Sequence, residues 1–201
     1  MAGLDREYQQ DFAAALAVAG TQTDICIFNC QGYINTMKNV NVSGEGVIFD
    51  LARMGAFDGV ISMRGTLANE AATQKLESFL QEMKEKPHVS IDVPSNGAVN
   101  ILFDDAISVR EMTEHMIVHH GAKKIVYVSG PAHNLVATNR LKACREAMAQ
   151  HGLELRPEDV YDGEWNQWKG REIAERLTEQ DESLPDAVIC GNDDMAFGII
   201  E

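Results

Sequence analysis

The sequence has no long hydrophobic run. Although 45% of its 201 residues are hydrophobic, no stretch approaches the ~18 residues that a membrane helix needs. It also has no cluster of basic residues, since 17 Lys and Arg are set against 31 Asp and Glu, a net charge of −14. Direct binding of nucleic acid by this chain is therefore not expected. The N-terminus lacks a basic stretch followed by an apolar core, so the sequence predicts a cytoplasmic protein without a secretory signal or a membrane span.

Cysteines are few, and none forms a C-x-x-C pair. Cys26 and Cys30 are four residues apart, which would place both on one side of an extended strand and does not suit a disulfide between them. Cys144 and Cys190 lie in apolar runs that resemble a helix and a strand. Each cysteine is therefore predicted to be a buried, reduced thiol.

The common motifs of catalysis are missing too. There is no G-x-S-x-G, no Walker phosphate loop and no G-x-G-x-x-G after a strand. The pairs Asp104-Asp105 and Asp193-Asp194 could in principle act as acid and base, but neighbours in sequence point in different directions. We therefore expect neither enzyme activity nor a cofactor.

Three histidines near one predicted helix end raise the question of a metal site. His115 and His119 have the i, i+4 spacing of a two-histidine site, but the acid of an H-E-x-x-H motif is lacking. Adjacent helical residues such as His119 and His120 point about 100° apart. A pair that interacts with the helix dipole explains them better, and no metal is expected.

One stretch of the chain contains a complete β-turn-α unit. Residues 125–128 form a short apolar run rich in β-branched side chains, and Ser129-Gly130-Pro131 ends it. Apolar residues then recur at helical spacing from Leu135 until Gly152. This is one unit of a parallel sheet, and polar side chains that follow its strand lie where open α/β sheets hold ligands.

The rest of the chain repeats that unit. Strands are predicted at 24–28, 57–63, 88–93, 100–103, 125–128, 159–161 and 187–190. Helices are predicted at 8–20, 47–54, 69–86, 109–120, 135–151, 168–179 and from Met195, and the 109–120 helix has a capping box of Ser108 and Glu111. Strands separated by helices indicate parallel sheets with helices on both faces. Two such series, joined near residues 100–107, predict an N-terminal lobe of residues 1–103 and a C-terminal lobe of residues 104–201.

Both ends interrupt this alternation. The first predicted element is a helix, and Met195 begins a helix that the last residue cuts off. We therefore expect a chain truncated at both ends, with a strand before Met1 missing.

Several motifs, taken in order, resemble a known family. They are HVSIDV…ILFDD, a helix ending in HHG, KKIVYVSGP, Arg140 in the next helix, GEW before G-x-x-I-A, and AVICGNDDMAFG. Together they resemble the sensor module of the LacI/GalR group, which has the type I periplasmic-binding-protein fold. The resemblance covers roughly Tyr8 to Glu201. It implies two Rossmann-like lobes that close on a small molecule, commonly a sugar or a nucleobase.

The resemblance also implies candidate ligand contacts. Arg140 resembles an arginine that contacts ligand, Asp193 an aspartate that takes ligand hydroxyls or an amine, and Trp165 an aromatic that stacks on the ligand. Asn134 lies in a loop whose polar residues help to line the cleft. Further candidates are Asp104 at the crossover between lobes, with Asp105 beside it, and Tyr8 and Asp5 in the first lobe.

Each candidate also has a purely structural explanation. Arg140 could be a solvated charge on a helix, although a guanidinium suits paired hydroxyls or carboxylates. Asp193 could cap the helix that follows it, a role open to Asn192 and Asp194 as well. Trp165 could simply pack between helix and sheet, although aromatic stacking is a usual means of holding a sugar face.

We interpret the chain as a ligand-binding sensor of a cytoplasmic signalling or transcription regulator, and we expect a homodimer. A sugar-like effector would bind between the lobes, and their closure would act on an output domain absent from this chain. That domain could bind DNA, or it could be another output such as a diguanylate cyclase. The alternatives are a small α/β enzyme acting on a sugar or nucleotide-like substrate, and a dimerisation body without ligand.

Overall fold

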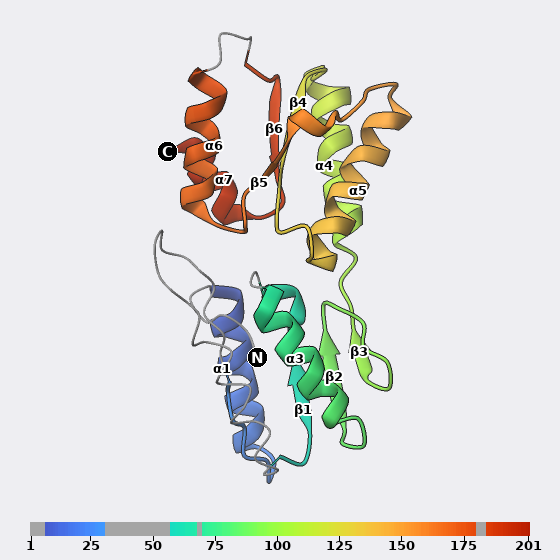
Figure 1. The fold of residues 1–201 in the computed structure, drawn as a ribbon, viewed down its shortest axis with the longest axis vertical. Coiled ribbons are helices and arrows are strands. Elements are labelled where there is room, and N and C mark those ends of the chain that lie inside the picture. The colour runs from blue at the N-terminus through green and yellow to red at the C-terminus, as the bar shows by residue number, and fades with distance from the viewer. Residues whose placement is uncertain (1–6, 31–56, 68–69, 180–183) are drawn as a thin grey trace. The chain divides into compact units, whose positions relative to one another are not determined.

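The computed structural model describes residues 7–30, 57–67, 70–179 and 184–201 (Figure 1). The chain divides into two compact units, and in the described residues the division falls between Leu102 and Phe103. Both units are α/β, with parallel sheets flanked by helices, as the sequence predicts.

The N-terminal unit contains a sheet of three parallel strands in the order β1-β2-β3. Its elements are α1 (Glu7–Thr21), β1 (Val60–Ser62), a 3-10 turn (Arg64–Thr66), α3 (Glu70–Glu82), β2 (His88–Ile91) and β3 (Val99–Ile101). Successive side chains of a strand point to opposite faces of a sheet. Val60 accordingly packs with the residues of α3, whereas Ile61 packs beside Phe12 of α1. The two helices therefore cover opposite faces.

Helix α3 forms where its apolar residues recur at intervals of three and four. Its inner face is the predicted one: four side chains are buried and Met83 is partly buried against them. The buried four are Ala72, Leu76, Phe79 and Leu80. The predicted helix at 47–54 lies outside the described residues.

The strand predicted at residues 24–28 is wrong. Residues 25–30 have no regular secondary structure, and Ile25, Ile27 and Phe28 are exposed. An apolar β-branched run becomes a strand only when it pairs with a neighbour, and this segment pairs with none of the described strands, among which β1 pairs with β2 alone. Ala15, predicted on the inner face of α1, is exposed as well.

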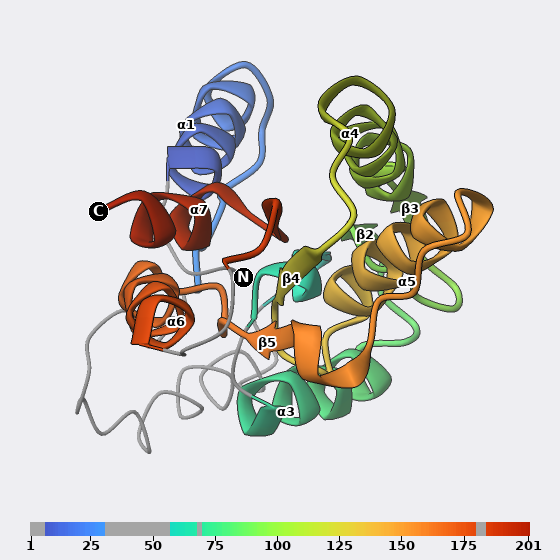
Figure 2. The ribbon, with the colours of Figure 1, turned by 90° about the horizontal axis from the view of Figure 1, so that it is seen from above.

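The C-terminal unit also has three parallel strands, here in the order β5-β4-β6. Its elements are α4 (Asp105–His120), β4 (Ile125–Ser129), α5 (Leu135–Gln150), a 3-10 turn (Pro157–Asp159), β5 (Val160–Asp162), α6 (Gln167–Glu179), β6 (Ala187–Cys190) and α7 (Asp193–Ile200). Figure 2 shows α4 and α5 on one side of β4 and α6 and α7 on the other.

Helices on both faces explain why β4 is buried throughout. Ile125 and Tyr127 lie in the core with α4 and α5, while Val126 and Val128 point to the opposite side. All four are at most 2% exposed. Burial raises the pKa of the Tyr127 hydroxyl well above its usual range, so this tyrosine stays neutral.

Helix α4 begins earlier than predicted. It starts at Asp105 directly after Asp104, so Ser108 lies within its first turns and the predicted capping box does not form. An acidic residue in the first turn is favoured by the helix dipole, and Asp105 provides it. Val109 and Thr113 are the buried residues of this helix, whereas Met112 is 42% exposed.

All four cysteines are free thiols, as predicted, but Cys26 is exposed rather than buried. Burial raises the pKa of Cys144, and that of Cys190 to about 12, so both stay protonated at neutral pH. No helix in the described parts of the chain combines the length and apolar character that crossing a bilayer requires.

Candidate functional site

The strands of the C-terminal unit end together at one edge of their sheet. Val128 of β4 is in register with Tyr161 of β5 and with Cys190 of β6. Because the strands are parallel, the loops after β4, β5 and β6 share this carboxyl edge, and α5, α6 and α7 begin from it. Open α/β sheets bind ligands at this edge.

Arg140 reaches this edge from α5. Its Nη1 donates a hydrogen bond to the carbonyl oxygen of Gly191 at 2.6 Å, just after β6. Its Nη2 lies 2.9 Å from Oδ2 of Asp105 at the start of α4, and its Cζ lies 5.7 Å from the ring centroid of Trp165. A carboxylate, a carbonyl and an aromatic ring therefore hold the guanidinium in place, and Arg140 is not a freely solvated charge.

Trp165 lies beneath that guanidinium and is 5% exposed. A Cβ added at Gly130 would overlap its ring, and one at Gly191 would lie 3.1 Å from Cζ3. The two glycines follow β4 and β6, so the ring packs flat against the ends of two strands. Trp165 is thus mainly a packing residue that supports Arg140, and only a small part of its ring could reach a ligand.

The turn that carries Trp165 has an unusual backbone. Glu164 and Trp165 have φ angles of 50° and 61°, values that residues with a side chain adopt rarely and at a cost of roughly 1–3 kcal/mol each. Surrounding polar groups hold the turn: Asn166 donates to the Glu164 carbonyl at 2.9 Å, and Asn192 donates to the Trp165 carbonyl at 3.4 Å. Backbone strain of this kind concentrates at functional sites.

Two of the predicted contacts lie at helix starts. The Oδ1 of Asn134 accepts from the Ala137 N–H at 3.1 Å, so this buried side chain caps α5. Asn192, not Asp193, caps α7, through a 3.0 Å hydrogen bond from the Met195 N–H. Asp193 lies in the first turn, exposed, and forms no hydrogen bond or ion pair with any part of the chain that the structure describes. Its carboxylate is accessible to a ligand.

The remaining candidates lie elsewhere. Asp104 precedes α4, is exposed, and makes no side-chain capping hydrogen bond. Tyr8 lies in the first turn of α1, but its side chain is outside the described residues, as is all of Asp5. The structure therefore joins Arg140 to Trp165. It adds the Gly191 carbonyl, which the sequence did not predict, and Asp105, which was named only as the neighbour of Asp104. An acidic residue in the first turn of a helix was the available signal for Asp105.

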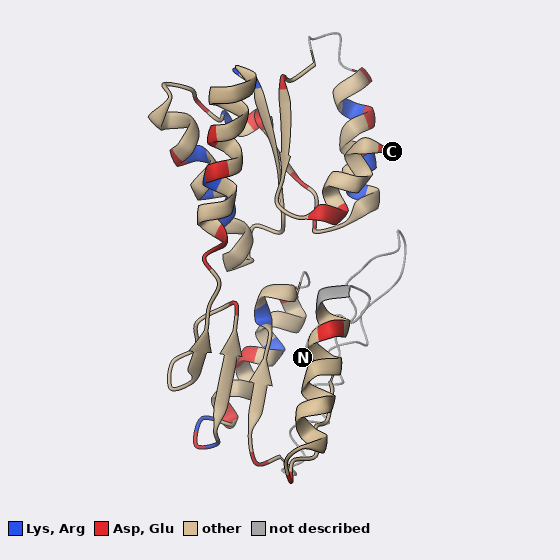
Figure 3. Ribbon diagram, turned by 180° about the vertical axis from the view of Figure 1, so that it is seen from behind, with Lys and Arg blue, Asp and Glu red and all other residues tan. Residues whose placement is uncertain are grey.

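Acidic side chains dominate this edge of the sheet. In the ribbon of Figure 3, acidic positions are red at the starts of α4 and α7, where Asp105 and the pair Asp193 and Asp194 lie. Glu164 follows β5, and Lys169 lies 3.5 Å from it and 3.8 Å from Glu172. Arg140 is therefore a cation in mainly acidic surroundings.

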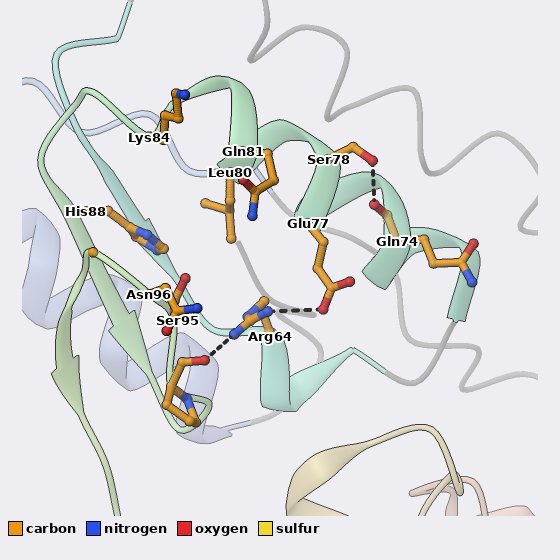
Figure 4. Close-up of a pocket in the computed structure, with 12 residues that line it drawn as sticks. Arg64, Gln74, Glu77, Ser78, Leu80, Gln81, Lys84, His88, Ser95 and Asn96 are labelled. Atoms are coloured by element: carbon orange, nitrogen blue, oxygen red, sulfur yellow. Dashed lines mark hydrogen bonds and ion pairs between the residues drawn. The ribbon is translucent and has the colours of Figure 1, made fainter.

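A hollow lies in the N-terminal unit, between α3 and the turn after β2 (Figure 4). Its volume is about 540 Å³, and its lining is largely polar. Arg64 lies at its base, where Nη1 is 3.1 Å from Oε1 of Glu77 and Nη2 donates to the Pro94 carbonyl at 2.6 Å. Beside it, Nε2 of His88 is 2.8 Å from Oγ of Ser62. Arg64 thus ties α3 to the turn after β2.

The histidines of α4 lie together without forming a metal site. Nε2 of His115 is 3.1 Å from Nε2 of His120, and its ring centroid is 4.9 Å from that of His119. Within the described ranges no group of three or more histidine, cysteine or acidic side chains is arranged to hold a metal ion.

Comparison with known proteins identifies the domain. Residues 114–201 match the periplasmic binding protein-like domain family. The chain is 26% identical over 147 residues to catabolite control protein A of Priestia megaterium, covering 71% of this chain and 42% of that protein. It is 29% identical over 173 residues to the HTH-type transcriptional repressor PurR of Histophilus somni, covering 85% of this chain and 50% of that protein. The chain thus spans half or less of the length of these relatives.

The fold agrees with that of solved regulators. The crystal structure of the transcription regulator CcpA of Lactococcus lactis matches the whole chain with a TM-score of 0.75 at 18% identity, over 69% of that structure. These relatives are named as regulators, which supports the expectation that the chain is not an enzyme. The resemblance to the LacI/GalR group is confirmed. Residues 114–201 thus match a periplasmic binding protein-like domain, and the chain is similar to LacI-family transcription regulators.

Proposed function

We propose that this chain is the ligand-sensing part of a transcription regulator, and that a small polar molecule of the sugar type binds at the carboxyl edge of the C-terminal unit. The observation that carries the proposal is the guanidinium of Arg140, held at that edge by Asp105, the Gly191 carbonyl and the Trp165 ring. A guanidinium fixed in this way is oriented before the ligand arrives, which lowers the entropic cost of binding.

Some of these residues hold the site in place, and others contact the ligand. The Gly191 carbonyl lies against Nη1 of Arg140 and the Asp105 carboxylate against Nη2. A guanidinium has five N–H groups, so others are left for ligand oxygens. The exposed carboxylate of Asp193 accepts ligand hydroxyl groups, and Asp193 begins α7 directly after Gly191 and Asn192. Asn134, Trp165 and Asp104 shape the edge; Tyr8 and Asp5 remain proposed contacts of the N-terminal unit.

Binding shifts the chain between conformations, and an output domain responds to that shift. By analogy with the repressors that it resembles, the output is DNA binding through a domain outside this chain, in a homodimer. Size-exclusion chromatography with light scattering tests the homodimer, for which a monomeric mass at all concentrations is the contrary result.

Thermal-shift screening of the full chain against sugars, nucleobases and amino acids tests the site. A hit is followed by titration calorimetry with Arg140→Ala, which we expect to lower affinity at least about tenfold, since it removes charge-assisted hydrogen bonds. Asp193→Ala is expected to weaken binding as well. Arg64→Ala is the matched control because it removes an arginine with the same kinds of partner in the other unit, and it should leave affinity unchanged. Equal affinities for Arg140→Ala and wild type would show that the site is wrong.

A further inference from the structure

Asp105 brings a negative charge to the proposed site besides holding Arg140 in place. It begins α4, and its Oδ2 lies 2.9 Å from Nη2 of Arg140. The two side chains are partly exposed, 33% for Asp105 and 24% for Arg140. The ion pair therefore stands at the surface where a ligand would reach the guanidinium, and any ligand meets Asp105 together with Arg140.

We infer that Asp105 determines the charge specificity of this site, by making it reject anionic ligands and accept uncharged polyhydroxyl ones. This inference rests on the proposed function. A phosphate or carboxylate bound to Arg140 would lie next to the Asp105 carboxylate, and two like charges at that separation repel each other. A hydroxyl group brings no such charge, and it can donate to a carboxylate while accepting from the guanidinium.

The other charges at the edge act in the same direction. Asp193 and Asp194 occupy the first turn of α7, and Asp104 precedes α4. Arg140 pairs with Asp105, whereas the carboxylates of Asp104 and Asp193 are exposed. An anionic ligand would therefore enter a region whose net charge is already negative.

Helix N-termini are the opposing influence, because each carries roughly half a positive charge. At this edge one N–H of α5 and one of α7 already have an acceptor: the side chain of Asn134 accepts from Ala137, and that of Asn192 accepts from Met195. In addition, the first turns of α4 and α7 contain aspartates, whose carboxylates each carry a full negative charge. Groups of the chain itself thus largely compensate the helix dipoles. Repulsion between like charges then determines the preference for uncharged ligands.

The test uses inorganic phosphate as an anionic probe, which requires no knowledge of the natural ligand. Asp105→Asn keeps an oxygen that can accept from Arg140 but removes the negative charge. Phosphate is titrated into the labelled full chain while the indole N–H of Trp165, next to Arg140, is followed by NMR. We expect no saturable shift in the wild type, and in Asp105→Asn a saturable shift with an affinity at least about tenfold higher.

Three further variants make the result specific. Glu146→Gln removes the same charge from the surface of α5, where Glu146 lies 3.3 Å from Arg110 and 3.7 Å from Lys142, and it should behave as the wild type. Asp105→Glu restores the charge and should again exclude phosphate, which loss of structure alone would not predict. Adding Arg140→Ala to Asp105→Asn should abolish the gained binding.

The outcomes separate the inference from the proposed function. Equal phosphate affinity in wild type and Asp105→Asn, or a gain that survives Arg140→Ala, overturns the role of Asp105 even if sugars bind. A screen in which no small polar molecule binds overturns the proposed function, while the phosphate titration still shows whether Asp105 controls the charge that Arg140 presents.

Discussion

Each unit contains an arginine bonded to one carboxylate and one backbone carbonyl. Arg64 binds Glu77 at 3.1 Å and the Pro94 carbonyl at 2.6 Å; Arg140 binds Asp105 at 2.9 Å and the Gly191 carbonyl at 2.6 Å. By these bonds alone the two residues are equivalent. Bonding geometry therefore does not distinguish a ligand contact from a structural brace.

Their surroundings do distinguish them. Arg140 lies over an aromatic ring, beside a turn with two left-handed residues, at an edge where three helices begin. Arg64 lies at the base of a hollow beside a histidine, and its Nε has no hydrogen-bond partner in the described part of the chain. These surroundings are the reason for proposing Arg140, and not Arg64, as the ligand contact.

The largest effect is expected from removing the Trp165 ring, which packs against Arg140. Trp165→Ala should lower the free energy of unfolding of the C-terminal unit by about 3–5 kcal/mol, the usual cost of deleting a large buried side chain. Urea denaturation followed by the fluorescence of Trp168 measures it, because the chain has two tryptophans and both lie in this unit.

Its matched control is Trp168→Ala, followed by the fluorescence of Trp165. Trp168 is only half-buried, with Nζ of Lys169 4.7 Å from its ring centroid, so a smaller loss is expected. Hydrogen exchange in β2 should be unchanged in both variants. A Trp165→Ala variant as stable as the wild type would show that the ring does not support Arg140.

Local patterns in the sequence predict some of these elements correctly and others wrongly. Periodicity locates α3 and β4, because each depends on a local pattern that a packed face then satisfies. It fails for residues 24–28, whose strand-like pattern would need a neighbouring strand for pairing. The capping-box pattern also fails at Ser108, where it predicts the start of α4. The helix begins at Asp105 instead, whose ion-pair partner Arg140 is distant in sequence.

The site shows the same division between local and long-range information. Family motifs in the sequence were enough to select Arg140 and Trp165, yet not the contact between them, which depends on the packing of the ring against Gly130 and Gly191. The role of Asn192 as a cap was one of several possibilities in the sequence, and a single hydrogen bond decides it.

A smaller effect is expected from relieving the left-handed backbone after one strand in each unit. Glu164 follows β5 with φ 50°, and Asp92 follows β2 with φ 68°. Glu164→Gly should stabilise the C-terminal unit by about 0.5–1 kcal/mol, since glycine adopts this conformation without strain. The surface ion pair with Lys169 that it removes contributes little. Tryptophan fluorescence during urea unfolding reports the change.

Asp92→Gly is the matching variant in the N-terminal unit. Aspartate tolerates the left-handed region better than glutamate does, so glycine should help less in the N-terminal unit, as measured by circular dichroism and by hydrogen exchange in β2. An equal or larger gain at Asp92 would place the greater backbone strain in the N-terminal unit, away from the proposed site.

The smallest effect concerns His88, beside Arg64. Burial, and then the positive charge of Arg64, lower the pKa of this histidine below its usual value. A pKa lower in the folded than in the unfolded state means that the contribution of His88 to stability is complete above about 6.5. That contribution is lost as the pH falls through the lower, folded-state pKa.

NMR titration of the histidine rings should show His88 protonating at a lower pH in the wild type than in Arg64→Ala. Arg140→Ala should leave the pKa of His88 unchanged, because each arginine acts on the groups of its own unit; an equal change in both variants would contradict the separate roles assigned to the two arginines.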